Sequence, residues 1–188
     1  MNTTEQEWFA KLERSWKRLC EDFARREFFP VSENDITCYL YHSLVAREGL
    51  ALNSVHTEYP VYGGKEVDIV LGRIPLEREA ANTSLFVQIK LRKRRLDYYL
   101  YHYKNIAERA FFGDDVEKLI KFKGIGSGVA VAFFQKLPPS PTYKEKSEDE
   151  TLRYWKELET SMIELEEKLK KEGVKLLYGP LLQFYKRG

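Results

Sequence analysis

The chain has 188 residues, of which 43% are hydrophobic and 14% aromatic, and its formal net charge is +2. This composition excludes a disordered chain, and the length is sufficient for one domain with a sizeable core. The small net charge excludes nucleic-acid binding through overall charge alone, so such binding would have to use a local cluster.

Two helices are predicted at the start of the chain. Apolar residues at helical spacing over residues 5–28 indicate one long amphipathic helix. Ser32, followed three residues later by Asp35, indicates the cap of a second helix, which Gly49 ends. Glu33 then lies in the first turn, where the helix dipole favours a carboxylate. This local role is one explanation of Glu33, and a role in a site is the other.

Both cysteines, Cys20 and Cys38, fall within helical apolar patterns and outside any CxxC or Cys/His cluster. They are therefore expected to be buried thiols rather than zinc ligands. The N-terminus carries no apolar signal core, and no stretch is long and apolar enough to span a bilayer. We expect a cytoplasmic protein with no membrane partner.

Three short strands are predicted next, over residues 54–62, 65–72 and 84–93. Gly63-Gly64 joins the first two as a tight reversal, and in the other two strands apolar residues alternate with polar ones. If the second connection folds back about its midpoint, Asp68 faces Gln88 and Glu66 faces Lys90. A carboxylate, an amide oxygen and an ammonium would then share one small volume.

The rest of the chain alternates helix and strand. The whole order is helix, helix, three strands, helix, strand, helix, strand, which predicts an α/β fold with a mixed sheet covered by helices. The remaining segments are a helix over 96–123 with a break near 112–114, a doubly buried strand over 126–136, a loop over 137–150, a helix over 150–172 and strand character over 174–187.

Five basic residues cluster at and beyond the third strand, and several tyrosines follow them. Such a cluster can hold phosphates while aromatic rings stack on bases, although a charged strand-to-helix turn or mixed packing explains it equally well. The candidate nucleic-acid contacts, beside Lys90, are Arg92, Lys93, Arg94, Arg95 and Tyr99.

At Asp68 and Gln88-Ile89-Lys90 the chain resembles the PD-(D/E)XK nuclease superfamily, whose fold is restriction endonuclease-like. The core of that family is a helix, an antiparallel three-strand meander, a helix and a further strand, and residues 32–136 supply this order. The first helix and residues 137–188 would be additions within a single domain. Gln88 stands where the family usually has Glu or Asp, and active members with Gln-x-Lys exist.

The resemblance implies a metal site. The Asp68 carboxylate, the Gln88 amide oxygen and the Ile89 main-chain carbonyl would hold Mg²⁺ or Mn²⁺, both of which accept oxygen ligands. Lys90 would hold the attacking water near the scissile phosphate. Glu33 matches the acidic position that the family carries on its helix, and Glu58 is a second candidate for added metal charge.

The expected function is therefore metal-dependent cleavage of DNA, with RNA as an open alternative substrate and a homodimer as an open assembly. Three alternatives compete with it. The chain could be a catalytically inactive nucleic-acid-binding module, or a protein-interaction scaffold that uses its terminal helices. In the third, Asp68 and Lys90 form a structural ion pair at a sheet edge and Gln88 is merely exposed.

Overall fold

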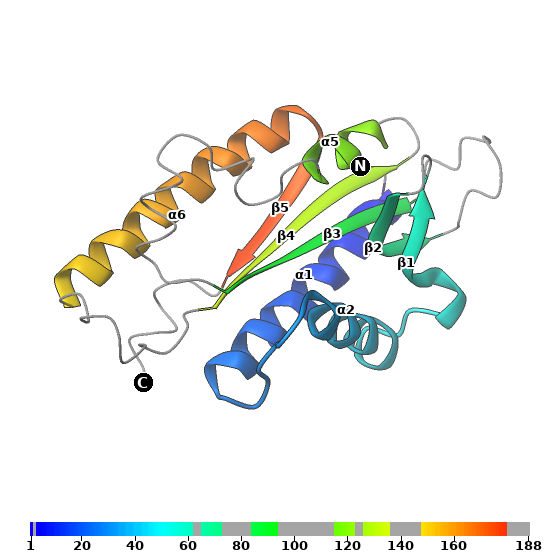
Figure 1. Cartoon of the computed structure of the whole chain (residues 1–188). Helices are drawn as coiled ribbons and strands as arrows, with labels where there is room; N and C mark the ends of the chain where they lie inside the picture. Colours follow the sequence, from blue (N-terminus) through cyan, green and yellow to red (C-terminus); the bar gives the residue numbers. More distant parts are fainter. Residues whose placement is uncertain are drawn as a thin grey trace.

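A five-stranded mixed sheet forms the centre of the protein (Figure 1). The computed structural model describes residues 1, 3–61, 65–72, 84–93, 115–122, 126–135 and 148–179. Its elements, in chain order, are α1 (Thr3–Ala24), α2 (Glu33–His42), the π-helical η1 (Ser43–Arg47), the 3₁₀-helical η2 (Leu52–Ser54), β1 (Val55–Val61), β2 (Lys65–Gly72), β3 (Ser84–Lys93), α5 (Asp115–Lys121), β4 (Ser127–Gln135), α6 (Glu148–Lys171) and β5 (Val174–Gly179).

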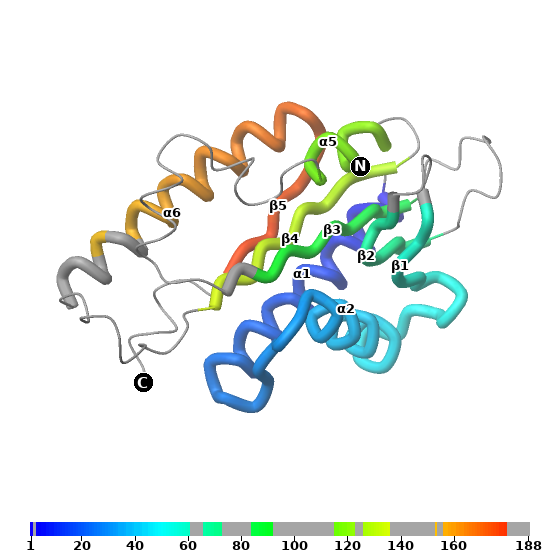
Figure 2. Tube along the Cα trace, in the orientation of Figure 1, coloured from blue at the N-terminus to red at the C-terminus, as the bar shows by residue number. Residues whose placement is uncertain are grey.

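The strands lie in the order β1-β2-β3-β4-β5, with two kinds of pairing. β1, β2 and β3 form an antiparallel meander, whereas β4 runs parallel to β3 and β5 runs parallel to β4. A parallel neighbour requires a crossover, and Figure 2 shows α6 carrying the chain from the end of β4 back to the start of β5. The predicted α/β class is confirmed, and the described elements follow the predicted order, while residues 96–114 of the predicted helix and residues 180–187 of the last predicted strand segment lie outside the described residues.

Helices cover both faces of the sheet (Figure 1): α1 and α2 lie on one face, and α5 and α6 lie on the other. The core accordingly has two clusters of buried side chains. The α1/α2 cluster includes Leu12, Ile36 and Val131, and the α5/α6 cluster includes Leu165. The alternation of β4 supplies both clusters, because successive side chains of a strand point to opposite faces. Its predicted burial on both faces is confirmed.

Local signals fix where α2 begins. The Ser32 hydroxyl accepts a hydrogen bond from the Asp35 N–H at 3.3 Å, and the Asp35 carboxylate accepts one from the Ser32 N–H at 2.8 Å. This is the predicted capping box, and it places Glu33 in the first turn of α2. The helical path then continues through η1 and ends before Gly49, whose φ of +68° suits glycine.

The first helix ends four residues earlier than predicted, at Ala24 rather than at residue 28. Arg26 adopts the left-handed conformation, with φ at +62°. Its N–H donates to the Phe23 carbonyl, and the Glu27 N–H donates to the Asp22 carbonyl. These two bonds form a Schellman cap, which the sequence hides because an arginine occupies the position that usually holds glycine.

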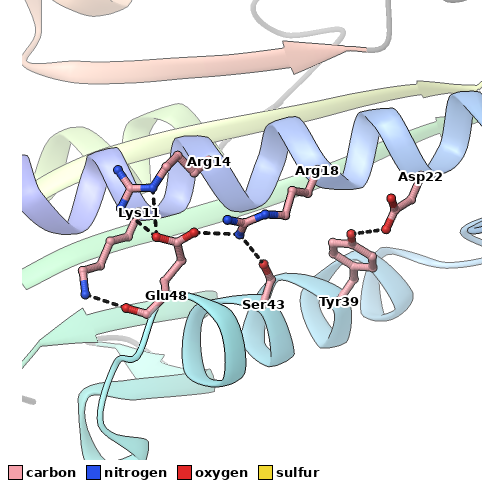
Figure 3. A network of polar contacts seen from close by, with 7 residues as sticks. All are labelled: Lys11, Arg14, Arg18, Asp22, Tyr39, Ser43 and Glu48. Atoms are coloured by element: carbon pink, nitrogen blue, oxygen red, sulfur yellow. Dashed lines mark hydrogen bonds and ion pairs between the residues drawn. The ribbon is translucent and has the colours of Figure 1, made fainter.

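A network of polar contacts joins α1 to the end of η1 (Figure 3). Arg14 and Arg18 both donate to the Glu48 carboxylate, in each case with a shortest distance of 2.6 Å, and Lys11 donates to the Glu48 main-chain carbonyl at 2.7 Å. Farther along, the Tyr39 hydroxyl donates to Asp22 at 2.5 Å. The network fixes α2, and therefore Glu33, against α1.

Two expectations of burial differ from the structure. Cys20 is buried as predicted, but Cys38 is exposed, because it lies on the solvent side of α2. The alternation of polar and apolar residues in β2 predicts Val67 and Ile69 on one face, yet Val67 packs in the α5/α6 cluster and Ile69 in the α1/α2 cluster. The regular alternation of β2 therefore breaks at Asp68. Among the described helices, none combines the length and apolar character needed to cross a membrane.

Candidate active site

The pairing of β2 with β3 stops where the polar residues begin. The register of this pairing runs from Gly72 opposite Ser84 to Ile69 opposite Val87. This is the predicted register, and the next pair along the two strands is Asp68 and Gln88. There the Gln88 amide donates to the Asp68 Oδ2 at 2.6 Å. The predicted contact between carboxylate and carboxamide is confirmed.

Asp68 also supplies an acceptor where the main-chain pairing of β2 with β3 has ended. Its Oδ2 accepts a hydrogen bond from the Ile89 N–H at 2.5 Å. Burial raises the pKa of Asp68 from 3.8 to about 6. The Ile89 N–H and the charge of Lys90 act in the opposite direction, and Glu33 and Asp115 add to the rise. The Asp68 carboxylate is thus partly desolvated, and among the described residues no cation forms an ion pair with it.

Gln88 and Gln135 are the two buried glutamines of the described sheet, and both have unpaired side-chain atoms. Gln88 is 4% exposed and, unlike Gln135, its amide nitrogen is bonded to a carboxylate, that of Asp68, while its Oε1 has no hydrogen-bond partner among the described residues. A buried carbonyl oxygen without a partner costs about 1–3 kcal/mol. The alternative in which Gln88 is merely exposed is therefore wrong.

Lys90 points to the same part of the molecule but contacts other carboxylates than predicted. Its ammonium lies 2.9 Å from Asp115 Oδ2 and 3.5 Å from Glu33 Oε2. The described residues contain no ion pair between Lys90 and Asp68, so the alternative of a structural Asp68–Lys90 pair is wrong. The predicted contact with Glu66 is also wrong, because β2 and β3 diverge beyond Asp68.

Glu33 reaches the site from α2, as the sequence suggested. Its Oε1 accepts a hydrogen bond from the Leu91 N–H at 3.1 Å, and its Oε2 faces Lys90. The Ile89 and Leu91 N–H groups both lie on the edge of β3 that β2 has left. Two carboxylates, from β2 and α2, therefore complete the hydrogen bonding of that edge.

Glu58 lies at the register position opposite Asp68 on β1, between Thr57, which pairs with Ile69, and Tyr59, which pairs with Val67. Its backbone has a φ of +51°, a conformation uncommon for residues other than glycine. The side chain is exposed. Among the described residues, the acidic groups that act on the pKa of Asp68 are Glu33 and Asp115, and Glu58 is not one of them.

Asp115 is a member of the site that sequence reasoning missed. It is the first residue of α5, and its two oxygens pair with Lys90 at 2.9 Å and with Lys118 at 2.6 Å. Burial acts to raise the pKa of Asp115, but the hydrogen bonds from Lys118 and Lys90 outweigh it and lower that pKa. The sequence signal was an acidic helix start at residues 114–115, which indicates a cap and not a site.

Comparison with family models, with curated proteins and with solved structures finds no match. What the site can do therefore follows from its own chemistry.

The described residues contain no group of three His, Cys, Asp or Glu side chains that could hold a metal ion. Oxygen donors of other kinds are nevertheless present beside Asp68. They are the unpaired Gln88 Oε1 and the Ile89 carbonyl, which points to the same side of β3 as the Ile89 N–H, as in any strand. One carboxylate and two neutral oxygens form a weakly charged set that suits a hydrated Mg²⁺ or Mn²⁺.

The predicted nucleic-acid contacts lie at the end of β3 and beyond it. The structure describes the backbone of Arg92 and Lys93 as part of β3, whereas Arg94, Arg95 and Tyr99 lie outside the described residues. Their part in binding stays a prediction.

Proposed function

We propose that this chain is a metal-dependent endonuclease of the PD-(D/E)XK type that hydrolyses phosphodiester bonds in DNA. The single observation that supports the proposal most is the buried, unpaired Oε1 of Gln88 next to the Asp68 carboxylate. The mixed sheet with its antiparallel meander, and α2 and α5 beside the site, is consistent with a restriction endonuclease-like core.

A divalent cation would relieve two energetic costs at this point. The Gln88 oxygen lacks a partner, and burial disfavours the charged form of Asp68. Coordination would satisfy the oxygen and neutralise the carboxylate together. We assign Asp68, the Gln88 Oε1 and the Ile89 carbonyl as the protein ligands, with Glu58 as an outlying candidate at the opposite register position.

A purely structural role explains only half of this arrangement. Asp68 could serve as a cap for the Ile89 N–H where the β-ladder ends. That role gives no reason for a buried glutamine with one free oxygen, because a residue without polar atoms would fill the same space at lower cost.

In the proposed reaction a bound metal would neutralise the phosphate and activate a water molecule. Lys90 would act as an ammonium that orients the attacking water and favours its deprotonation. Burial acts to lower the pKa of Lys90, but Asp115 and Glu33 outweigh it and raise that pKa, so the side chain stays charged. A fixed positive charge near the phosphate also stabilises the negative charge that develops in the transition state.

The test is incubation of supercoiled plasmid with the full chain in Mg²⁺ or Mn²⁺, alongside Asp68→Asn, Lys90→Met and Glu66→Gln variants purified identically. Glu66 is an exposed carboxylate of the same strand as Asp68, which makes Glu66→Gln a matched control for charge. We expect nicking by the parent chain and by Glu66→Gln, and a loss of about 100-fold or more in the other two. No nicking by the parent, or equal nicking by all variants, contradicts the proposal. A parallel RNA substrate decides between the two nucleic acids.

A second candidate is a nuclease-fold module that binds nucleic acid without cutting it. The observation that favours it is the neutral Gln88 in the position of an acidic ligand, which leaves Asp68 as the one carboxylate in contact with that carboxamide among the described residues. Binding would then fall steeply with salt and be independent of divalent cations. Calorimetry that detects Mg²⁺ binding to the parent chain and not to Asp68→Asn would argue against this candidate.

A further inference from the structure

Lys90 extends from the same strand face as Gln88, two residues farther along β3. Lys90 is close enough to the half-buried Asp68 carboxylate of β2 for their charges to interact. Its ammonium instead pairs with Asp115 at 2.9 Å and with Glu33 at 3.5 Å. The direct partners of Asp68 are the Gln88 amide and the Ile89 N–H.

Asp115 is itself held in place from two sides. Lys118, one turn farther along α5, pairs with the second oxygen of Asp115 at 2.6 Å. The Lys118 ammonium also lies 3.4 Å from the Glu66 carbonyl of β2. The Asp115 carboxylate, which is 13% exposed, is thus locked between an amine of β3 and an amine of its own helix.

We propose that Asp115 is a positioning residue that anchors the Lys90 ammonium on the α5 side of the site and so keeps Asp68 and the Gln88 oxygen free for a divalent cation. The inference rests on the proposed metal site. Without Asp115, the Lys90 ammonium would keep its contact with Glu33 and would be free to approach Asp68, whose charge already acts on it. It would then compete with the metal for that charge.

The experiment is a double-mutant cycle read out as Mn²⁺ affinity by calorimetry on the full chain without nucleic acid. The four proteins are the parent, Asp115→Asn, Lys90→Met and the double variant, with Glu66→Gln as the control for the loss of one nearby negative charge. We expect Asp115→Asn to weaken binding about tenfold when Lys90 is present, and about twofold or less when Lys90 is replaced by Met. Asp115→Glu should recover most of the affinity.

The possible results distinguish the positioning role of Asp115 from the existence of the metal site. Equal weakening by Asp115→Asn in both backgrounds, or a Glu66→Gln variant that weakens binding as much, would overturn the positioning role and leave the metal site intact. An absence of Mn²⁺ binding by the parent chain would overturn the proposed function itself. Thermal unfolding of all six proteins separates these outcomes from a loss of folding, since a folded Asp115→Asn with unchanged affinity also contradicts the proposal.

Discussion

At the scale of single residues, two unfavourable features occur side by side on β2 and β3. Asp68 is a half-buried acid whose pKa is raised, and Gln88 presents a buried oxygen with no partner among the described residues. Asp68 contributes to the fold by accepting a hydrogen bond from the Ile89 N–H, but its desolvation and the unpaired Gln88 oxygen both lower stability. Residues that lower stability in this way are typical of functional sites, where activity depends on groups that the fold alone would not select.

The raised pKa of Asp68 predicts a stability difference with a defined sign. Because the pKa is about 6 in the folded state and 3.8 ordinarily, the native state takes up a proton more readily than the unfolded chain between these values. Stability from this group is therefore full below about pH 4 and is lost as the pH rises through about 6. Replacing Asp68 by Asn should raise the free energy of unfolding at pH 8 by about 1–3 kcal/mol, and by almost nothing at pH 4.

Urea unfolding in the presence of a chelator measures this difference at pH 4, 6 and 8. The matched control is Glu58→Gln, which removes an exposed carboxylate at the opposite register position and should leave the unfolding free energy unchanged. A gain for Asp68→Asn that is constant over the whole pH range would show that charge at this carboxylate is not the cause.

The contact between Asp68 and Gln88 could be predicted because polar and apolar residues alternate clearly in the sequences of both strands. The observed register is the one expected if the connection between these strands folds back about its midpoint. The partner of Lys90 could not be predicted. Asp115 lies 25 positions after Lys90 in the sequence, beyond residues 94–114. Local periodicity does not show that the start of a helix at this distance contacts a strand. The change of face in β2 at Asp68 could not be predicted either, because Val67 is apolar and can pack on either face of the sheet.

At the scale of elements, the position of Glu33 depends on how firmly α2 and η1 are attached to α1. Glu48 makes this attachment: its side chain is 6% exposed and accepts from both Arg14 and Arg18 (Figure 3). The hydrogen bonds from Arg14 are the largest cause of the lowered pKa of Glu48, and those from Arg18 add to it, against the effect of burial. The attachment is therefore electrostatic at the η1 end, and farther along the interface the Tyr39–Asp22 hydrogen bond adds to the apolar packing.

Replacing Glu48 by Gln should destabilise the protein by about 1–3 kcal/mol at pH 7, because a buried partner of two arginines loses its charge while water screens the arginines in part. The sign of the pH dependence is opposite to that of Asp68. A lowered folded pKa gives stability that is present above about pH 4.3 and is lost as the pH falls through the folded value.

The comparison variant for this measurement is Glu157→Gln, which breaks an exposed pair with Arg153 at 3.9 Å. That change should cost about 0.5 kcal/mol or less. Equal effects of the two substitutions in urea unfolding at pH 7 would mean that Glu48 adds nothing beyond an ordinary surface charge.

Element boundaries were predictable where chain chemistry alone decides them. The bounds of β2 and β3, 65–72 and 84–93, agree with the sequence pattern, as does the start of α2 at its capping box. The end of α1 was not predictable, since the left-handed Arg26 has no sequence signature. The π-helical turn of η1 was not predictable either. Its hydrogen bonds join residues five positions apart, and those of an α-helix join residues four positions apart.

At the scale of the whole molecule, one sheet separates two cores that never meet directly. Leu12 is fully buried in the cluster beneath α1 and α2, and Leu165 is 3% exposed in the cluster beneath α6. β4 supplies side chains to both clusters, with Val131 on one face and Ala132 on the other. The strands that hold the site run between the two cores, so the packing of either face positions Asp68 and Lys90.

This arrangement predicts that the two cores unfold together. Leu12→Ala and Leu165→Ala are matched truncations on opposite faces, and each should lower the free energy of unfolding by about 2–5 kcal/mol. Because the side chains lie in separate clusters, the double variant should show the sum of the two effects within about 0.5 kcal/mol. Urea unfolding followed by far-ultraviolet circular dichroism and by tryptophan fluorescence should give coincident single transitions for all four proteins. If Leu165→Ala, in a Trp155→Phe background that leaves Trp8 and Trp16 of α1 as the tryptophans, instead produced an early transition in helical signal while the fluorescence stayed native, the faces would be independent and the sheet would not transmit packing to the site.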